Sequence, residues 1–376
     1  MEDGSTGYLQ TMHVATRYLR FMARCAWVCV LAWTGSLRRA KRHLRESGSI
    51  VTLTFHRVLD DAARQSTNSL PGIIIRERTF QELIRYLAGC CELVDFSDAK
   101  PGVAVGKVRL ALTFDDGWSD NFSTAFPILC AYNVPAEIFV CPQVVDTVMP
   151  FWPERASLLL RAARPDITDR QIAEQVESLK RLGPAEREQS MERWRLEPQK
   201  QRSGDNALDV DRTLSWDQIM EMDQAGICFG SHTDSHQILT TIPPDLVREE
   251  VEHSKATLER TLGKTCRVFA YPNGDWSPET REMVAQAGFT RAAVTTSGVW
   301  TSASDPLALP RSNVSESDAV GISGRFWPAM FEYTTLWKAY RAATRTVRSV
   351  SVYPNAARPS SVTKSDLSNS PDLSKA

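Results

Sequence analysis

Paired-cysteine motifs are absent from this sequence. Its eight cysteines stand at positions 25, 29, 90, 91, 130, 141, 228 and 266, and no two of them form a Cys-x-x-Cys pair. Several lie in apolar runs, as Cys130 does in FPILCAY. The pattern therefore does not indicate a disulfide framework, and free buried thiols in a reducing compartment are the favoured interpretation.

A long hydrophobic run is also missing. The most apolar stretch, CAWVCVLAWTG at residues 25–35, is about half the roughly 20 residues that a bilayer-spanning helix needs. Between Arg17 and Arg45 there are eight Lys or Arg and no Asp or Glu. We expect residues 15–46 to form a basic amphipathic helix in peripheral contact with an anionic membrane. A signal or anchor segment and a plain docking helix remain alternatives.

The chain has no excess of charge of either sign. Its net charge is −1 over 376 residues, with 42% hydrophobic and 24% charged residues. This is ordinary globular composition, long enough for one large α/β domain or two smaller ones. We expect no nucleic-acid partner, and a cytoplasmic protein, at most peripheral on the inner face of the membrane; a secreted or anchored form is less favoured.

Strand-like and helix-like segments alternate along the chain, which predicts a parallel sheet or barrel. Ser119 or Asp120 is the expected cap of the second helix. The expected strands are residues 49–59, 107–114, 135–140, 227–232, 266–272 and 290–296. The expected helices are residues 79–89, 118–133, 215–226, 243–263 and 277–288.

The alternation suggests boundaries for the parts of the chain. Residues 1–48 are the basic N-terminal segment, and residues 49–325 form the main domain. Residues 149–213 interrupt the pattern and are predicted to be a helical insertion within that domain. Residues 326–376 comprise a C-terminal helix and a Ser-rich tail that we expect to be disordered.

Two motifs carry the candidate chemistry. In RLALTFDDGWSDN (109–121) a buried strand ends in Asp115 and Asp116, and burying unpaired carboxylates is costly unless a positive charge compensates. In GSHTDSH (230–236) another strand is followed by His232 and His236, spaced i, i+4. Two imidazoles and one carboxylate make a divalent-metal triad, which supplies that charge. Alone, each motif could be an ordinary turn or a chance spacing.

The motifs FDDG and SHTDSH, with TFHRV, PAEIFV and FAYPNG, resemble those of NodB-like polysaccharide deacetylases (carbohydrate esterase family 4), in particular the exopolysaccharide-deacetylase branch. The resemblance runs from about Ile50 to Val314. It implies an α/β fold, a distorted (β/α) barrel of about seven strands. It also implies a metal-dependent hydrolase that removes N-acetyl groups from a glycan in bacterial surface or exopolysaccharide metabolism.

The same resemblance implies roles for individual residues. Asp115 would be the general base, and Asp116, His232 and His236 would hold the metal, Zn²⁺ in the first place, with Co²⁺ or Ni²⁺ as alternatives. Many family members carry an arginine where this chain has Ala270 in AYPNG. We expect Arg311 to replace it beside the base.

The general acid is the second departure from the family pattern. No histidine follows His253, which we interpret as lying on a solvated helix face. His56 in TFHRV is therefore the candidate acid, with a buried strand histidine as the alternative. Without an acid, activity on amides would be weak, which keeps an O-acetyl sugar esterase and an inactive glycan-binding protein as alternative functions.

Substrate contacts are expected from the residues around these motifs. The backbone N–H of Tyr271, or of a neighbour, is a candidate oxyanion donor. Pro272, Asn273 and Trp118 are candidates for the rim of an acetylated-glycan site, with turn formation and packing as the alternative. Residues 151–153 open the insertion and could place it as a lid over the groove.

Overall fold

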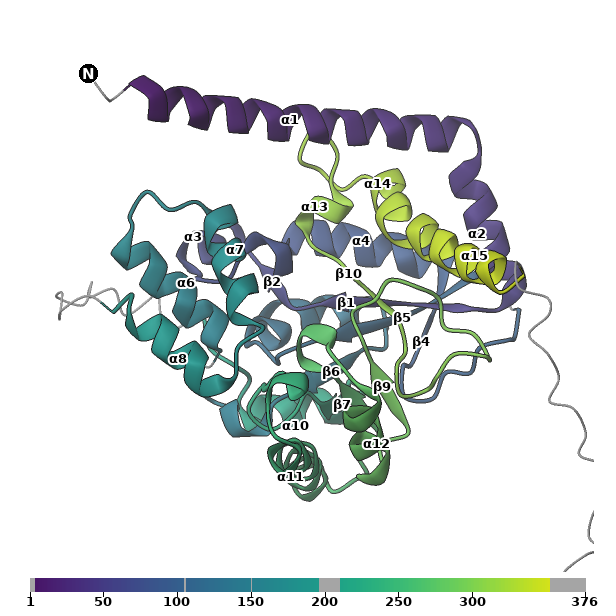
Figure 1. The fold of residues 1–376 in the computed structure, drawn as a ribbon. Coiled ribbons are helices and arrows are strands. Elements are labelled where there is room, and N and C mark those ends of the chain that lie inside the picture. The colour runs from purple at the N-terminus through teal and green to yellow at the C-terminus, as the bar shows by residue number, and fades with distance from the viewer. Residues whose placement is uncertain (1–3, 105, 150, 196–209, 352–376) are drawn as a thin grey trace, which may run out of the picture.

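A nearly closed barrel of parallel strands forms the centre of the molecule (Figure 1). The computed structural model describes residues 4–104, 106–149, 151–195 and 210–351. Seven strands follow one another in the order β10-β1-β5-β6-β7-β8-β9, and β4 pairs with the first half of β5. A bridge between Ala293 and Leu309 brings the two ends of this path together. The predicted distorted barrel of about seven strands is confirmed.

The sheet strands are short and buried. They are β1 (Ile50–Phe55), β4 (Cys91–Val94), β5 (Val108–Phe114), β6 (Glu137–Val140), β7 (Cys228–Ser231), β8 (Val268–Ala270), β9 (Arg291–Ala293) and β10 (Arg311–Asn313). Outside the barrel, β2 (Arg57–Leu59) pairs with β3 (Ile74–Arg76).

Helices cover the outside of the barrel. The described α-helices are α1 (Gly4–Trp33), α2 (Ser36–Ser47), α3 (Asp61–Ser66), α4 (Glu77–Cys90), α5 (Phe126–Ala131), α6 (Trp152–Ala163), α7 (Asp169–Leu179), α8 (Pro184–Glu192), α10 (Trp216–Gln224), α11 (Pro244–Leu262), α12 (Pro278–Gln286), α13 (Glu316–Ala319), α14 (Pro328–Glu332) and α15 (Lys338–Ser351). The predicted insertion contributes α6, α7 and α8, which form their own apolar cluster at one side of the barrel (Figure 1).

Alternate residues of each strand face the barrel interior, as the period of a strand requires. The interior is filled by a separate apolar cluster that includes Ala111, Phe139, Ala270 and Ala293. Small residues leave room for the Phe139 ring. Gly230 on β7 shows how little space remains, because a Cβ added there would lie 2.7 Å from that ring. The barrel is therefore a packed core, open only where its strands end.

Three predicted elements differ from the structure. The single helix expected over residues 15–46 is two helices, α1 and α2, with a break at Gly35, whose φ is 73°. The strand expected over residues 49–59 is split at His56, and its second half joins β3 in a separate sheet. The helix expected over residues 118–133 begins with a π-helical turn, Asn121–Ala125. Asp120 precedes it but does not cap it, because its carboxylate accepts hydrogen bonds from Val58 N (2.7 Å) and Arg57 Nε (3.0 Å). That carboxylate instead fixes the chain after His56.

The N-terminal helices lie against the C-terminal ones. Cys25 and Val28 of α1 pack on Met330 of α14, and α1 runs along one edge of the molecule (Figure 1). Among the described helices, none is both long enough and apolar enough to cross a bilayer. All eight cysteines are free, as predicted, but only Cys25, Cys91, Cys141 and Cys266 are buried, and the prediction that Cys130 is buried was wrong. The predicted disordered tail lies outside the described residues, and the predicted domain boundaries stay predictions.

Candidate active site

The sequence-predicted residues meet where the barrel strands end. Asp115 and Asp116 directly follow β5, and Asp115 N donates to Phe55 O of the neighbouring β1 at 3.0 Å. His232 directly follows β7, and its backbone N–H donates to Val140 O of β6 at 2.9 Å. The carboxyl ends of parallel strands are where sites gather in α/β folds, because loops from several strands converge there.

Asp115 forms a two-pronged ion pair with Arg311 of β10. Nη1 and Nη2 of Arg311 each donate to one oxygen of Asp115 at 2.7 Å, and both side chains are almost fully buried. Arg311 also donates to Thr113 Oγ1 and Val294 O, so its guanidinium group is fixed. Burial alone would raise the pKa of Asp115, but the charge and hydrogen bonds of Arg311, together with His232 and His56, outweigh it and the pKa is lowered. Asp115 is therefore held as a carboxylate.

Asp116, His232 and His236 form a cluster beside this pair. Asp116 Oδ1 lies 3.5 Å from Nε2 of His232 and 3.3 Å from Nε2 of His236. The ligand atoms of the three residues all lie within 4.8 Å of one another, as a shared cation requires. His232 Nδ1 lies 2.7 Å from Ala270 O, a contact that makes Nδ1 the donor and leaves Nε2 free to act as a ligand.

The protonation of these groups suits a metal. Burial lowers the pKa of His232 to about 4, so the imidazole is neutral. Burial opposes ionisation of Asp116, but His236 outweighs this effect and lowers the pKa of that carboxyl. Trp118 Nε1 donates to Asp116 Oδ2 at 3.0 Å and orients the carboxylate. The donor set of two imidazoles and one carboxylate fits a divalent cation such as Zn²⁺.

The backbone around the cluster is unusual. Asp116, Thr233 and His236 have positive φ angles of 75°, 64° and 63°. Non-glycine residues rarely adopt this region, and a β-branched threonine does so least readily. The i, i+4 spacing therefore corresponds to a strained loop rather than to a helical turn, and the surrounding contacts must hold it.

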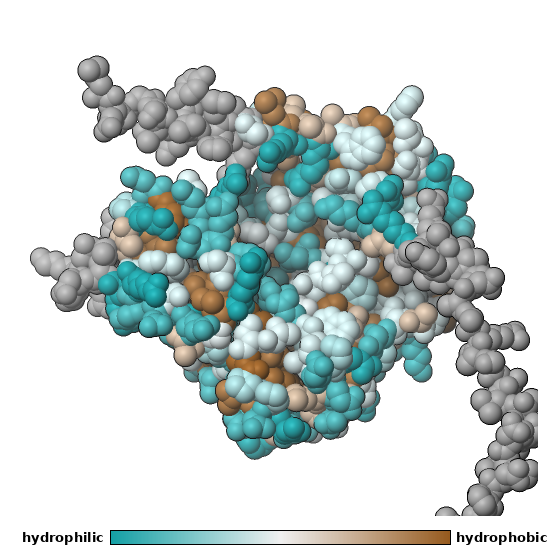
Figure 2. Space-filling model, in the orientation of Figure 1, coloured by the Kyte–Doolittle hydropathy of each residue, from teal (hydrophilic) through white to brown (hydrophobic). Residues whose placement is uncertain are grey.

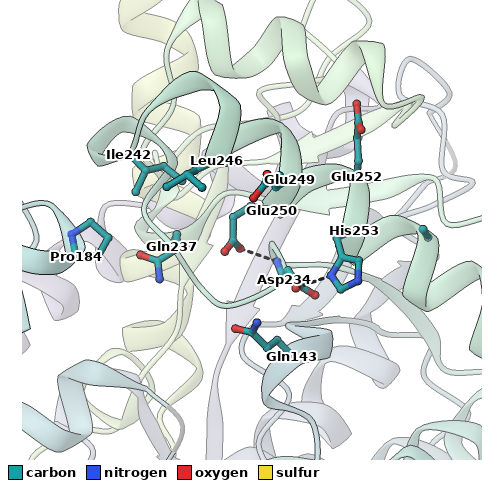
Figure 3. A pocket seen from close by; sticks show the side chains of 11 residues that line it. Gln143, Pro184, Asp234, Gln237, Ile242, Leu246, Glu249, Glu250, Glu252 and His253 are labelled. Carbon is teal, nitrogen blue, oxygen red and sulfur yellow. Dashed lines mark hydrogen bonds and ion pairs between the residues drawn. The ribbon is translucent and has the colours of Figure 1, made fainter.

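Helix α11 supplies those contacts from behind the loop, where a large cavity opens (Figure 3). Glu250 accepts hydrogen bonds from Asp234 N (2.9 Å), Ser235 N (2.8 Å) and the Ser235 hydroxyl group (2.5 Å). His253 Nδ1 lies 2.7 Å from Asp234 Oδ2. His253 is exposed, as predicted, but it also anchors the histidine loop. No sequence pattern indicated this second role.

His56 lies at the bend between β1 and β2 and lines the same cavity as the two aspartates. Asn121 Nδ2 donates to His56 O at 2.8 Å, which fixes the bend. Nδ1 of His56 is buried and has no hydrogen-bond partner among the residues that the structure describes. No hydrogen bond to Nδ1 therefore fixes the imidazole, and the residue reaches the site through its place in the cavity lining.

The site opens into a cavity of about 320 Å³. The insertion forms one wall with Phe151, Trp152 and Glu154, and Asn273 contributes from another side. Glu154 is a residue that the sequence analysis missed. It is buried, it accepts a hydrogen bond from Ser69 Oγ at 3.0 Å, and burial together with the charge of Asp116 raises its pKa to about 7. Its place directly after FWP, the predicted opening of the insertion, was the available signal.

Three expected substrate contacts are not supported. Trp118 is fully buried between Phe151 and the Arg57 guanidinium group, so it packs the site from behind instead of forming its rim. Tyr271 is also fully buried, and its backbone N–H donates to Ala293 O at 3.1 Å, so it is not a free oxyanion donor. Pro272 is buried beside it. Trp118 and Tyr271 each donate a side-chain hydrogen bond toward the protein interior, which composition cannot reveal.

Comparisons with known proteins identify the family. The model of the family described as polysaccharide deacetylase matches residues 102–292, more than half of the chain. YxkH of Bacillus subtilis (strain 168), whose name assigns it to the polysaccharide deacetylases, is 23% identical over 221 residues. That match covers 59% of this chain and 55% of YxkH, so this chain spans about half the length of its curated relative.

Solved structures resemble the same region. A de-N-acetylase from Aggregatibacter actinomycetemcomitans is 17% identical with a TM-score of 0.50, and the match covers 73% of this chain and 98% of that one. IcaB from Ammonifex degensii is 20% identical with a TM-score of 0.49, over 78% and 98% of the two chains. The similarity to the de-N-acetylase bears on the fold alone. Together with the family match over the FDDG and SHTDSH segments, the barrel and its strand-end cluster show that the chain belongs to the polysaccharide deacetylase family.

Proposed function

We propose that this protein hydrolyses N-acetyl groups of a glycan, in bacterial surface or exopolysaccharide metabolism, with the help of a divalent metal. The observation that carries the proposal is that an ion pair and a cluster of metal-ligand residues lie side by side at one cavity. One is the Asp115–Arg311 pair, and the other is the cluster of Asp116, His232 and His236. This arrangement separates a fixed base from a metal-ligand set, although the two carboxylates are adjacent in sequence.

Asp116, His232 and His236 would hold the metal. A bound divalent cation supplies Lewis-acid polarisation of an acyl carbonyl group and makes water a better nucleophile at neutral pH. Arg311 keeps Asp115 ionised and oriented, and Asp115 accepts the proton of the attacking water. His56 donates a proton to the leaving amine when the C–N bond breaks, which leaves acetate and a free amino group. The position of His56 in the lining of the cavity that holds both aspartates supports this assignment.

The test compares the native protein with Asp115→Asn. Bound metal is measured by elemental analysis, and acetate release is measured with acetylated chito-oligosaccharides and supplied zinc, cobalt or nickel. We expect both proteins to bind metal and only the native one to release acetate. If neither protein retained metal, Asp116, His232 and His236 would not form a working site, and a glycan-binding protein would be the better interpretation.

We also propose that residues 15–46 bring the protein to the inner face of an anionic membrane. Leu19, Trp27, Val30 and Trp33 of α1 are exposed, and Trp33 keeps 85% of its surface accessible. In Figure 2 hydrophobic atoms lie along the edge that α1 occupies in Figure 1. The basic residues flanking this surface complement anionic lipid headgroups. The free cysteines support a reducing compartment.

A further inference from the structure

The barrel interior carries a second polar cluster, where β6 and β7 begin. Glu137 on β6 and Cys228 on β7 are register partners, and both precede the residues that lead to the candidate active site. Asp95 follows β4, which ends beside the start of β6. Ligand atoms of these three residues lie within 4.8 Å of one another. Phe139 packs between Arg311 (5.4 Å) and Phe96 (5.9 Å), and so separates this cluster from the active-site ion pair.

The segment after β4 closes this end of the barrel. Phe96 and Ala99 belong to the apolar cluster that fills the interior. Arg291 of β9 donates to Phe96 O at 2.5 Å and to Ala99 O at 2.9 Å, and its guanidinium group lies over Trp300. Arg291 thus holds the backbone of this segment on one side, and Asp95 lies on its other side, toward β6 and β7.

Glu137 is the unexplained member of the cluster. It is 1% exposed, and its Oε2 accepts a hydrogen bond from the Ser97 hydroxyl group. Within the described part of the chain, its Oε1 has no hydrogen-bond partner. A buried carboxylate oxygen without a partner is costly, and a native site normally satisfies it with a proton, a water or an ion. The Cys228 thiol already donates a hydrogen bond to Asp95, with its Sγ 3.3 Å from Asp95 Oδ2.

The charges around the cluster leave this deficit in place. Lys264 and Arg291 are the nearby cations that favour ionisation. Lys264 is paired with Asp223, and Arg291 is directed at two backbone carbonyls. Neither forms an ion pair with the cluster among the described residues.

We propose that Asp95, Glu137 and Cys228 form a second, structural metal site for a divalent cation of the zinc class. Two carboxylates and a thiolate are ligands that zinc and cobalt accept, whereas calcium and magnesium avoid sulfur. Binding replaces the thiol proton, which passes to solvent as the metal–sulfur bond forms. The ion joins the segment after β4 to β6 and β7, so it fastens the closed end of the barrel. This proposal stands independently of the proposed function.

Cobalt distinguishes the two sites directly, because only the second one contains sulfur. Untagged native protein is stripped with a chelating resin and titrated with Co²⁺, and a thiolate-to-cobalt charge-transfer band is followed in the near ultraviolet. Bound metal per chain is counted by elemental analysis. We expect two equivalents in the native protein, and one in both Asp116→Asn and Cys228→Ser. The band should persist in Asp116→Asn and vanish in Cys228→Ser.

Two further variants keep the result interpretable. Glu137→Gln imitates a protonated carboxyl group and should fold, yet it should lose one equivalent of metal. Cys90→Ser removes a thiol of the adjacent Cys90–Cys91 pair and should change neither the band nor the metal count. The proposal is wrong if the native protein shows no charge-transfer band. It is equally wrong if the band survives Cys228→Ser or disappears in Cys90→Ser. Failure of the active-site proposal alone would instead leave a single, sulfur-containing equivalent.

Discussion

At the scale of single residues, the adjacent aspartates Asp115 and Asp116 show how one local pattern serves two tasks. Successive side chains at a strand end point in different directions, so Asp115 meets Arg311 while Asp116 meets the two histidines. The pairing of carboxylates was readable from the sequence. The compensating arginine is far away in the chain, and its place beside Asp115 could only be inferred through a family resemblance.

His56 gives the first prediction. If its imidazole protonates the leaving group, His56→Ala should lower kcat on N-acetyl substrates by about 100- to 10,000-fold. The loss on O-acetyl esters should be much smaller, because an alkoxide leaves more readily than an amide anion. Acetate release from matched amide and ester substrates measures both rates. The control is His43→Ala, which replaces a histidine that packs on Tyr340 of α15. Equal losses on both substrates would rule out the acid role.

Glu154 gives a pH dependence with a definite sign. Its pKa is about 7 in the folded protein against the ordinary 4.5, so the folded state binds the proton more tightly than the unfolded chain. The free energy of unfolding therefore falls as pH rises through this interval. For metal-free protein, we compare the free energies of unfolding of Glu154→Gln and the native protein. Their difference should change by about 3 kcal/mol in favour of the variant as the pH rises from 4.5 to about 7. Urea unfolding at several pH values measures it. A pH-independent difference would contradict the assignment.

At the scale of secondary-structure elements, α11 acts as a support for the histidine loop. Removing the charge of Glu250 weakens three hydrogen bonds that hold this strained backbone. We expect Glu250→Gln to lower the affinity for Zn²⁺ at the active site by about 10-fold or more, as for other supporting residues of metal ligands. Competition with a chelating dye measures this affinity in a Cys228→Ser background. Glu249→Gln on the same helix is the control, and equal affinities in both variants would contradict the supporting role.

Helix α1 gives the membrane prediction. Trp27→Ala with Trp33→Ala removes two exposed aromatic side chains and should sharply reduce binding to vesicles that contain phosphatidylserine. Co-sedimentation with such vesicles, and with neutral phosphatidylcholine vesicles, measures the effect. Leu246→Ala, an exposed apolar residue of α11, controls for general loss of hydrophobic surface. If the native protein ignored anionic vesicles, or formed a dimer through α1 instead, the proposed membrane contact would be wrong.

Elements also mark the limit of prediction from sequence. Strand and helix periods located most elements, because these periods are local properties of the chain. The split at His56 was not readable, since residues 50–59 keep an apolar, strand-like composition across the bend. What divides them is a distant contact, the hold of Asp120 on Val58. The prediction that Trp118 lies at the rim of the site was wrong for a similar reason. Its indole N–H donates a hydrogen bond to Asp116 behind the site instead of facing solvent.

At the scale of the whole molecule, the barrel has no spare interior volume. A methyl group added at Gly230 would lie 2.7 Å from both the Phe139 ring and the Val268 side chain. We expect Gly230→Ala to reduce the free energy of unfolding by about 1–3 kcal/mol, the usual cost of overpacking a core. Chemical denaturation measures it. Gly72→Ala, where a Cβ meets no atom within 4 Å, is the control. A stability equal to that of the control would show that the interior can relax.

The order of synthesis gives the Asp115–Arg311 contact a further meaning. These two residues are separated by 196 positions, and Arg311 belongs to the last strand of the barrel. A nascent chain that has already made the aspartates and both histidines of the cluster still has a base without its partner. The ion pair that the proposed hydrolysis requires therefore forms late, when the final strand docks on β1. A chain that ends before Arg311 lacks the partner of Asp115, so the proposed hydrolysis would depend on a closed barrel.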